Sequence, residues 1–448
     1  MAHSSPLALY CVGEGAALPE GLSPLQRQWA VANGFAGQRG RLLPLPDTQG
    51  AVSAYLFGLG AAEDRPKLIT GLAGAALEEG DYALAGDFGD PTLAALGFRL
   101  GAYRFDRYRK TPPAPRLALP TGADDGEVAR LAEAAFLARD LINTPANDLG
   151  PEAFEKEIRA FATRHQMTVK AIVGDELLVH NFPMIHAVGR GGPAAPRLMD
   201  LTWGSDSDPR VTLVGKGVTF DTGGLDIKPS SGMLLMKKDM GGAANVLGLA
   251  HAVMAAGLNV RLRVLIPIVE NSISANAFRP GDVLPSRSGQ TVEIGNTDAE
   301  GRLILADALT LADEEGPELI LDMATLTGAA RTALGPDLPP LYSTDDDLAR
   351  ALMVAGLASD DPLWHMPLWA PYKSMLTSKI ADVNNVSPGA FAGSVTAALF
   401  LKRFVSNARA WVHLDIFGWA PEARPGRPFG GTDQGIRAVY GVLKQRYS

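Results

Sequence analysis

The chain has 448 residues, 46% of them hydrophobic and 20% charged, so it can bury the cores of two or three domains. Its 49 acidic and 41 basic residues give a formal net charge of -8, which disfavours sequence-independent nucleic-acid binding, because such binding depends on a basic surface. The single cysteine excludes an internal disulfide framework, and the sequence has neither a membrane-spanning apolar stretch nor a signal-like N-terminus, so we expect a cytoplasmic protein without a membrane segment.

The first 122 residues predict a small N-terminal α/β domain. Alternation of apolar residues indicates two strands in this region, and helical periodicity indicates two helices. These predicted elements are strands at 7–12 and 51–57 and helices at 24–33 and 91–103. A proline-rich linker at 111–115 follows, and then an alanine- and leucine-rich helical pattern at about 124–142. We therefore place the domain boundary between residues 122 and 123, just before this linker helix.

Residues 123–448 predict a larger C-terminal catalytic α/β domain with a mixed central sheet flanked by helices. Strand-like and helical runs alternate along this region, as in a sheet that carries helices on both faces. The predicted strands are at 211–214, 260–268 and 319–323, and the predicted helices are at 243–256 and 303–314. Because open α/β sheets bind ligands beyond the ends of their strands, we expect the functional site in the loops that follow these strands.

Two short blocks of this domain concentrate charge in otherwise apolar, glycine-rich surroundings. Together they supply four carboxylates, two lysines and one arginine: Asp221, Asp239, Asp298, Glu300, Lys216, Lys228 and Arg302. Four carboxylates buried without cations would cost many kcal/mol, whereas two divalent cations balance them. Paired cations can also activate a shared water and polarise a carbonyl, so this inventory predicts a two-metal hydrolytic centre. An isolated D-x-E-x-R motif, by contrast, is more often a solvated loop with a surface ion pair.

Other motifs of catalysis and binding are missing from the sequence. The glycines at 215, 217, 223 and 224 match neither G-x-G-x-x-G nor G-x-x-x-x-G-K-[ST], which disfavours a phosphate-binding loop. They indicate instead a sharp turn after the strand at 211–214, where the backbone could approach an ion. No pair of the seven histidines has the H-E-x-x-H spacing, and no serine lies in G-x-S-x-G. A zinc-protease helix and a serine nucleophile therefore lack support.

The charged blocks resemble those of the leucyl aminopeptidase family, the cytosol aminopeptidases of peptidase family M17. Residues 214–244 read VGKGVTFDTGGLDIKPSSGMLLMKKDMGGAA and residues 296–303 read NTDAEGRL, and both are similar to signature blocks of that family. Further similar blocks are NTPAN at 143–147, ATLTGA at 324–329 and HLDI at 413–416. The resemblance implies a metal-dependent aminopeptidase that removes N-terminal residues, preferably leucine and other apolar ones, by attack of a metal-bridging hydroxide.

Carried over residue by residue, the resemblance implies two divalent metal ions per subunit, zinc or manganese. One metal ion would be bound by Lys216, Asp221, Asp239 and Glu300. The other would be bound by Asp221, Asp298 and Glu300 together with the backbone carbonyl of Asp298. A lysine can ligate a metal only as a neutral amine, so Lys216 would have to be deprotonated.

The same resemblance assigns catalytic roles to two further side chains. Lys228 would stay an ammonium and polarise the scissile carbonyl. Arg302 would hold a bicarbonate ion as the general base, and its planar guanidinium suits a planar anion.

Substrate preference and assembly are also implied by the resemblance. Four residues are similar to part of the family's pocket for the first substrate side chain: Met236, Asn296, Thr325 and Leu326. For Met236, a role as core filler is an equal alternative. The segment at 424–431, RPGRPFGG, departs from the more usual glycine-rich ending, so the family's specificity does not carry over there. Peptide substrates and a homohexamer are the expected partners.

A DNA-binding or regulatory protein on the same scaffold is the alternative function, since fold alone does not determine function. The intact set of seven charged positions favours the enzyme.

Overall fold

The computed structural model describes residues 5–448. The chain forms two compact units: the described residues up to Phe136 with Ala420–Gly430, and Leu137–Trp419 with Gly431–Ser448. The N-terminal unit thus includes a segment from near the other end of the sequence. The helix α4 (Asp125–Asn143) contributes residues to both units. No helix among residues 5–448 is long and apolar enough to cross a membrane.

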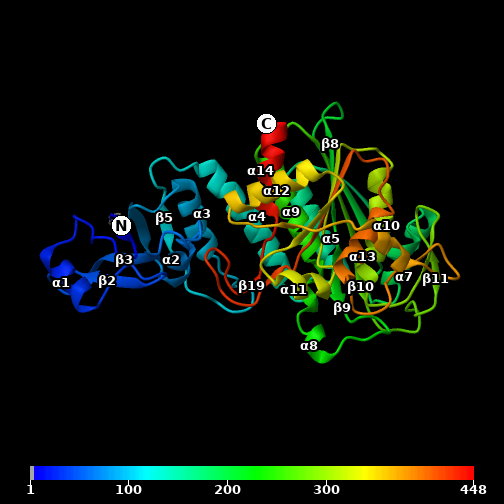
Figure 1. Ribbon diagram of the computed structural model, residues 1–448, viewed down its shortest axis with the longest axis horizontal. Helices are drawn as coiled ribbons and strands as arrows, with labels where there is room; N and C mark the ends of the chain where they lie inside the picture. Colours follow the sequence, from blue (N-terminus) through cyan, green and yellow to red (C-terminus); the bar gives the residue numbers. More distant parts are fainter. Residues whose placement is uncertain (1–4) are drawn as a thin grey trace. The chain divides into compact units, whose positions relative to one another are not determined.

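The N-terminal unit is a five-stranded sheet with helices on both faces, drawn in blue and cyan in Figure 1. Its elements are β1 (Leu7–Gly13), α1 (Pro24–Ala32), β2 (Leu42–Pro46), β3 (Val52–Gly60), α2 (Gly71–Ala76), β4 (Asp81–Gly86), α3 (Pro91–Gly101) and β5 (Arg116–Ala118). The strand order is β2-β3-β1-β4-β5, and only the β2–β3 pair is antiparallel. Both predicted strands and both predicted helices of this region are confirmed.

Alternate side chains of β1 are buried in two separate cores, one on each face of this small sheet. Leu9 and Cys11 face a core that includes Ile69 and Phe98, below α2 and α3. Val12 faces the opposite core, which includes Ala30 of α1. A strand that is buried on both faces has to be apolar at successive positions, as the sequence LALYCVG of β1 is.

The second unit contains the predicted mixed sheet, with nine strands in the order β15-β14-β17-β13-β8-β10-β7-β6 and β9 paired with β10. Its elements in chain order are α5 (Pro151–Arg164), β6 (Thr168–Val173), α6 (Glu176–Val179), α7 (Pro183–Gly189), β7 (Arg197–Trp203), β8 (Arg210–Gly215), β9 (Gly217–Asp221), α8 (Ser230–Met233), η1 (Met236–Met240), α9 (Gly241–Ala255), β10 (Arg261–Asn271), β11 (Val283–Pro285), β12 (Thr291–Glu293), α10 (Glu300–Asp313), β13 (Leu319–Ala324), α11 (Gly328–Leu334), β14 (Pro340–Ser343), α12 (Asp346–Ala358), β15 (Trp364–His365), η2 (Ala370–Leu376), β16 (Val383–Asn384), α13 (Gly393–Lys402), β17 (Ala410–Asp415) and α14 (Ile436–Tyr447). The short strands β18 (Trp419–Ala420) and β19 (Gly430–Gly431) each have one residue in either unit.

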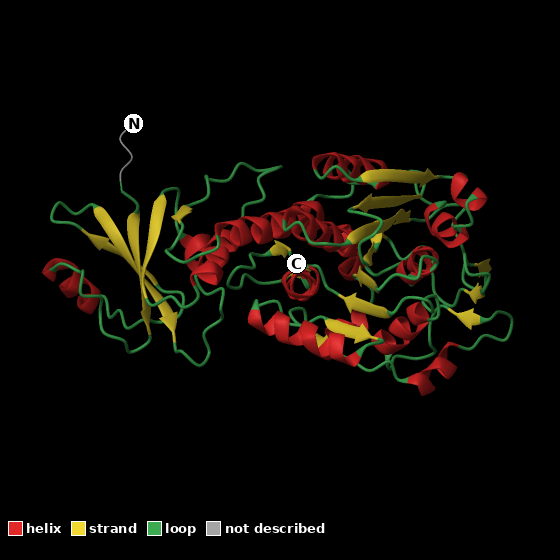
Figure 2. Ribbon diagram, turned by 90° about the horizontal axis from the view of Figure 1, so that it is seen from above, coloured by secondary structure: helices red, strands yellow, loops and turns green. Residues whose placement is uncertain are grey.

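Helices cover both faces of this sheet, as Figure 2 shows. Val214 of β8 and Ile320 of β13 join one core with the side chains of α10, α7 and α13, and α9 packs on the opposite face with α14. The central strands β8, β10 and β13 run parallel, so their carboxyl ends lie at the same edge. Parallel strands with both faces covered are nearly continuous apolar runs, which is why the sequence pattern predicted them.

A buried ion-pair cluster ties α4 to α14 within the second unit. Asp433 Oδ1 accepts a hydrogen bond from Arg139 Nε at 2.9 Å and lies 2.8 Å from Arg139 Nη2. Asp433 Oδ2 pairs with Arg437 Nη1, and all three side chains are at most 2% exposed. Removal of one partner from such a cluster leaves uncompensated buried charge.

We therefore expect Asp433→Ala to lower the free energy of unfolding by about 3–5 kcal/mol. Urea unfolding followed by tryptophan fluorescence measures this change. The control is Asp347→Ala, which removes an exposed pair with Arg350 and should change the free energy by about 0.5 kcal/mol or less. Equal effects of the two substitutions would contradict the expectation.

Candidate metal centre

Four acidic side chains gather where the parallel strands of the large sheet end. Asp221 is the last residue of β9, Asp239 lies in η1, and Asp298 lies in the loop before α10. Glu300 is the first residue of α10, three residues before the predicted start of that helix. The prediction that this helix begins at residue 303 is therefore wrong, and Glu300 and Arg302 project from its first turn.

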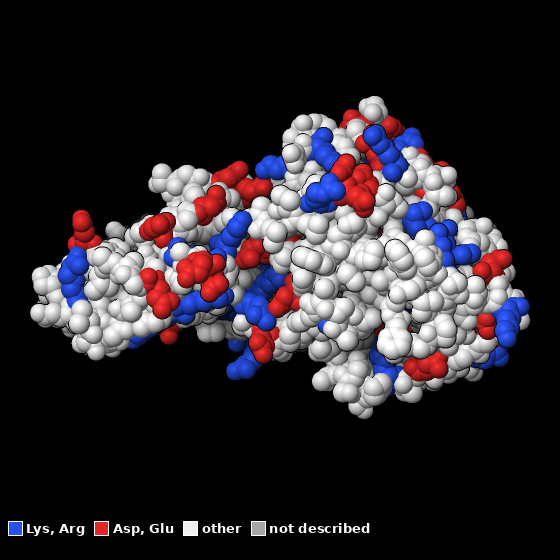
Figure 3. Space-filling view, in the orientation of Figure 1, with Lys and Arg blue, Asp and Glu red and all other residues white. Residues whose placement is uncertain are grey.

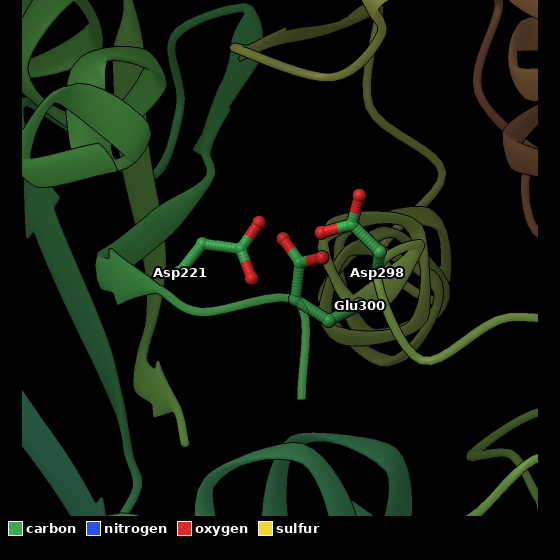
Figure 4. Close-up of side chains that lie close together, drawn as sticks. All are labelled: Asp221, Asp298 and Glu300. Carbon is green, nitrogen blue, oxygen red and sulfur yellow. The ribbon is translucent and has the colours of Figure 1, made fainter. Parts of the chain in front are cut away.

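The carboxylates of Asp221, Asp298 and Glu300 converge, as Figure 4 shows. One oxygen from each lies within 4.8 Å of the other two. Asp221, Asp239 and Glu300 are buried, whereas the side chain of Asp298 is 33% exposed. The cluster therefore has a buried floor and one side that is open at Asp298.

Each of the two lysines lies between two of these carboxylates. Lys216 Nζ lies 2.8 Å from Asp239 Oδ2 and 2.8 Å from Glu300 Oε1. Lys228 Nζ lies 2.8 Å from Asp221 Oδ2 and also pairs with Asp298 Oδ1. Burial alone would lower the pKa of Lys216, but the carboxylates around it raise that pKa above its ordinary value. The carboxylates therefore stabilise a positive charge at both positions, between Asp239 and Glu300 and between Asp221 and Asp298.

Crowding raises the pKa of two of the acids. Burial, followed by the charge of Asp221, raises the pKa of Glu300 well above its usual range, and the same two causes raise the pKa of Asp298 to about 6. Among residues 5–448, Asp239 Oδ2, Asp298 Oδ1 and Glu300 Oε1 are buried oxygens that accept no well-oriented hydrogen bond, although each lies within ion-pair distance of a lysine. Buried carboxylate oxygens with free lone pairs fit divalent cations.

Two residues predicted for the substrate pocket form hydrogen bonds to acidic residues of the cluster. Thr325 Oγ1 donates to Asp239 Oδ1 at 2.8 Å, and Asn296 Oδ1 accepts from the backbone N–H of Asp298 at 2.7 Å. These contacts do not test the pocket assignment, which remains a prediction for both residues. The other two predicted pocket residues, Met236 and Leu326, are half-buried.

Glycines give the backbone access to this site. Gly223 and Gly224, with φ of +89° and +65°, form a turn that follows β9, whereas the sequence placed the turn after the strand at 211–214. Gly215 has no positive φ, but a Cβ there would lie 2.5 Å from Ala243 Cα. A Cβ on Gly301 would lie 2.5 Å from Lys216 Cε, so only glycine lets this lysine reach Glu300.

Arg302 is buried beside the acidic cluster. Its Nη1 donates to the carbonyl of Asn385, and its Nε has no hydrogen-bond partner among residues 5–448. Burial lowers the pKa of Arg302 to about 10, against the opposing effect of Glu300 and Asp415. A buried guanidinium with an unused donor is suited to an anion.

Three supporting residues were not predicted from the sequence. Asn271 Nδ2 donates to Asp221 Oδ1 at 2.8 Å, and Asn385 Oδ1 accepts from the backbone N–H of Gly295 at 2.7 Å. Asp415 Oδ1 accepts hydrogen bonds from the backbone N–H groups of Leu326 and Thr327, both at 3.1 Å. Asp415 lies in the HLDI block, which is a signal that could have singled it out, whereas the two asparagines stand in no motif.

Comparisons with known proteins identify the family. The family model described as the cytosol aminopeptidase family, catalytic domain, matches residues 136–440, and that of the M17 aminopeptidase, N-terminal domain, matches residues 6–120. A probable cytosol aminopeptidase of Geotalea uraniireducens is 38% identical, with 96% of this chain and 92% of that protein covered.

Two solved structures are similar to the chain over nearly their whole length. The cytosol aminopeptidase of Coxiella burnetii is 45% identical, with a TM-score of 0.93 and coverage of 99% of this chain and 98% of that one. The bottromycin maturation enzyme BotP in complex with Mn is 34% identical, with a TM-score of 0.90 and coverage of 99% and 100%.

These matches define a peptidase, and hence a hydrolase. The chain belongs to the cytosol aminopeptidase family, peptidase family M17, as the sequence blocks predicted. The alternative of a DNA-binding protein on this scaffold gains no support from them.

We expect Gly301→Ala to weaken Mn²⁺ binding by roughly 10- to 100-fold, because the added methyl group displaces Lys216 from Glu300. Isothermal titration calorimetry measures the affinity. The control is Gly441→Ala in α14, where the nearest atom to an added Cβ is Ala355 Cβ at 3.7 Å. Unchanged affinity in a folded Gly301→Ala protein would show that Lys216 does not need its observed position.

Proposed function

We propose that the protein is a dimetal aminopeptidase that removes N-terminal residues, preferably leucine and other apolar ones, from peptides. The observation that carries the proposal is the convergence of Asp221, Asp298 and Glu300. Lys228 lies between Asp221 and Asp298, and Lys216 lies between Glu300 and the fourth acid, Asp239. The family to which the chain belongs supports the reaction class.

The residues that would hold two divalent cations are Lys216, Asp221, Asp239, Asp298 and Glu300. When bound, the cations would lower the pKa of a shared water and polarise the peptide carbonyl. Oxygen ligands with one amine accept zinc or manganese, and the Mn complex of BotP supports manganese. On loading, Lys216 Nζ would release its proton and turn its lone pair toward the site.

Lys228 would act on the open side of the centre. Its side chain is 14% exposed and lies next to Asp298, the most exposed of the acids. Its ammonium would donate hydrogen bonds to the carbonyl oxygen as negative charge develops there. The substrate amine would lie on the opposite side, near Lys216, so that the two lysines bracket the first peptide bond.

Arg302 would hold a bicarbonate ion through its unused Nε–H and a second N–H of the guanidinium. The anion would accept the proton of the attacking water, which is the role that the family resemblance implies for it. The half-buried side chains of Met236 and Leu326 would contact the first side chain of the substrate, with Asn296 and Thr325 beside them.

We further propose that the protein is a homohexamer and that it is located in the cytoplasm. Sedimentation measures the first, and fractionation of cells the second. On the face drawn in Figure 3, basic side chains are interspersed with acidic ones, which gives a DNA backbone no continuous basic patch there.

Hydrolysis of leucine p-nitroanilide should disappear on chelation and return with manganese or zinc. In the loaded protein, Lys228→Ala should lower kcat by about 100- to 1,000-fold, because it removes a donor to the developing oxyanion. Lys379→Ala, an exposed lysine outside the cluster, is the control. Turnover that survives complete metal removal, or a fully active Lys228→Ala protein, would refute the proposal.

Arg302→Lys keeps the positive charge but loses the two-pronged guanidinium. In CO₂-free buffer, added bicarbonate should raise the rate of the native protein and leave the variant unaffected, with its rate lower by roughly 100-fold or more, the contribution typical of a general base. A variant that responds to bicarbonate as the native protein does would remove Arg302 from this role.

A further inference from the structure

A cavity of about 390 Å³ lies in the N-terminal unit, and none of the residues that line it belongs to the metal centre. It opens beyond the carboxyl ends of β1, β3 and β4. β1 pairs with β3 on one side and with β4 on the other. The strands that follow β1 in the chain are thus added first to one side of it and then to the other, which makes β1 a topological switch point. Open α/β sheets bind ligands at such switch points.

Glycine ends all three strands at this cavity: Gly13 in β1, Gly60 in β3 and Gly86 in β4. Gly60 and Gly86 have φ of +75° and +91°. The three strand ends themselves therefore present backbone and no side chains to the cavity. Arg65 extends over it, since its Nη2 lies 3.0 Å from the position of a Cβ on Gly13.

The guanidinium of Arg65 is largely unused. Its Nη2 donates a long hydrogen bond of 3.5 Å to the carbonyl of Gly60, and its Nε is buried without a hydrogen-bond partner among residues 5–448. It forms no ion pair with a carboxylate within that range. A forked donor of this kind suits a carboxylate.

The cavity also has two carboxylates and an apolar wall. Glu14 and Asp87 are exposed at its rim, and neither pairs with Arg65. Val12 and Pro19 contribute apolar surface, and the thiol of Cys11, which is buried in the adjoining core, adds no charge, because burial raises its pKa to about 12. One cation, two anions and an apolar wall match a ligand that carries a carboxylate, an ammonium group and an apolar side chain.

We propose that this cavity binds a free α-amino acid with an apolar side chain. Its carboxylate would pair with Arg65, its ammonium would face Glu14 and Asp87, and its side chain would contact Val12 and Pro19. The choice of apolar amino acids rests partly on the proposed function, because that reaction releases them. A phosphate would fit Arg65 but would be repelled by the two acids.

Calorimetric titration of the metal-loaded full-length protein with L-leucine tests this site. The affinity for leucine at this site should fall by roughly 10- to 100-fold in Arg65→Gln and also in Glu14→Gln. Glu14 is exposed, so its substitution should leave the fold intact even where Arg65→Gln does not. Arg99→Gln, an arginine outside the cavity, is the control. N-acetyl-leucine and leucinol, which lack the ammonium and the carboxylate respectively, should show no Arg65-dependent binding.

Identical leucine titrations of the native protein, Arg65→Gln and Glu14→Gln would overturn the proposal, as would Arg65-dependent binding of inorganic phosphate in place of leucine. Leucine that binds independently of Arg65 belongs to the metal centre. A protein that binds leucine through Arg65 but does not cleave leucine p-nitroanilide would refute the proposed function and leave this site intact, so the two failures are distinguishable.

Discussion

Repulsion among buried carboxylates is the interaction on which the candidate site depends. Asp221, Asp239 and Glu300 are removed from water at the strand ends, and the raised pKa of Glu300 reflects how unfavourable a further negative charge is there. In the described structure, Lys216 and Lys228 supply the compensating charge. Divalent cations can supply more positive charge at the same positions, and for that reason we interpret the cluster as a metal centre.

The fold brings these charges together through close backbone packing. α9 begins at Gly241, two residues after Asp239, and packs on β8 and β13. A Cβ on Gly242 would lie 2.1 Å from the carbonyl oxygen of Met323. Gly215 meets the same helix from β8. The contact between helix and sheet thus sets the position of Lys216, which follows Gly215, relative to Asp239. A rigid scaffold of this kind holds like charges near one another that would separate in a flexible loop.

Much of this architecture could be predicted from the sequence, because it rests on local patterns. Apolar runs in the sequence predicted the central strands, and the two charged blocks predicted the members of the acidic cluster. The start of α10 was misplaced because Glu300 and Arg302 are polar, although they occupy the first turn of a buried helix. Asn271 and Asn385 escaped prediction because their partners, Asp221 and Gly295, are 50 and 90 residues away in the sequence, where no periodicity connects them.

The segment Ala420–Gly430 belongs to the N-terminal unit, although Leu137–Trp419, which belong to the second unit, separate it from the rest of that unit in the sequence. Gly426 lies so close to Gly71 of α2 that a Cβ on Gly71 would be 2.2 Å from its backbone nitrogen. During synthesis, the ribosome has to deliver almost the whole polypeptide before this part of the N-terminal unit can assemble. The early-made unit therefore reaches its final form late, which couples the maturation of the two ends of the molecule.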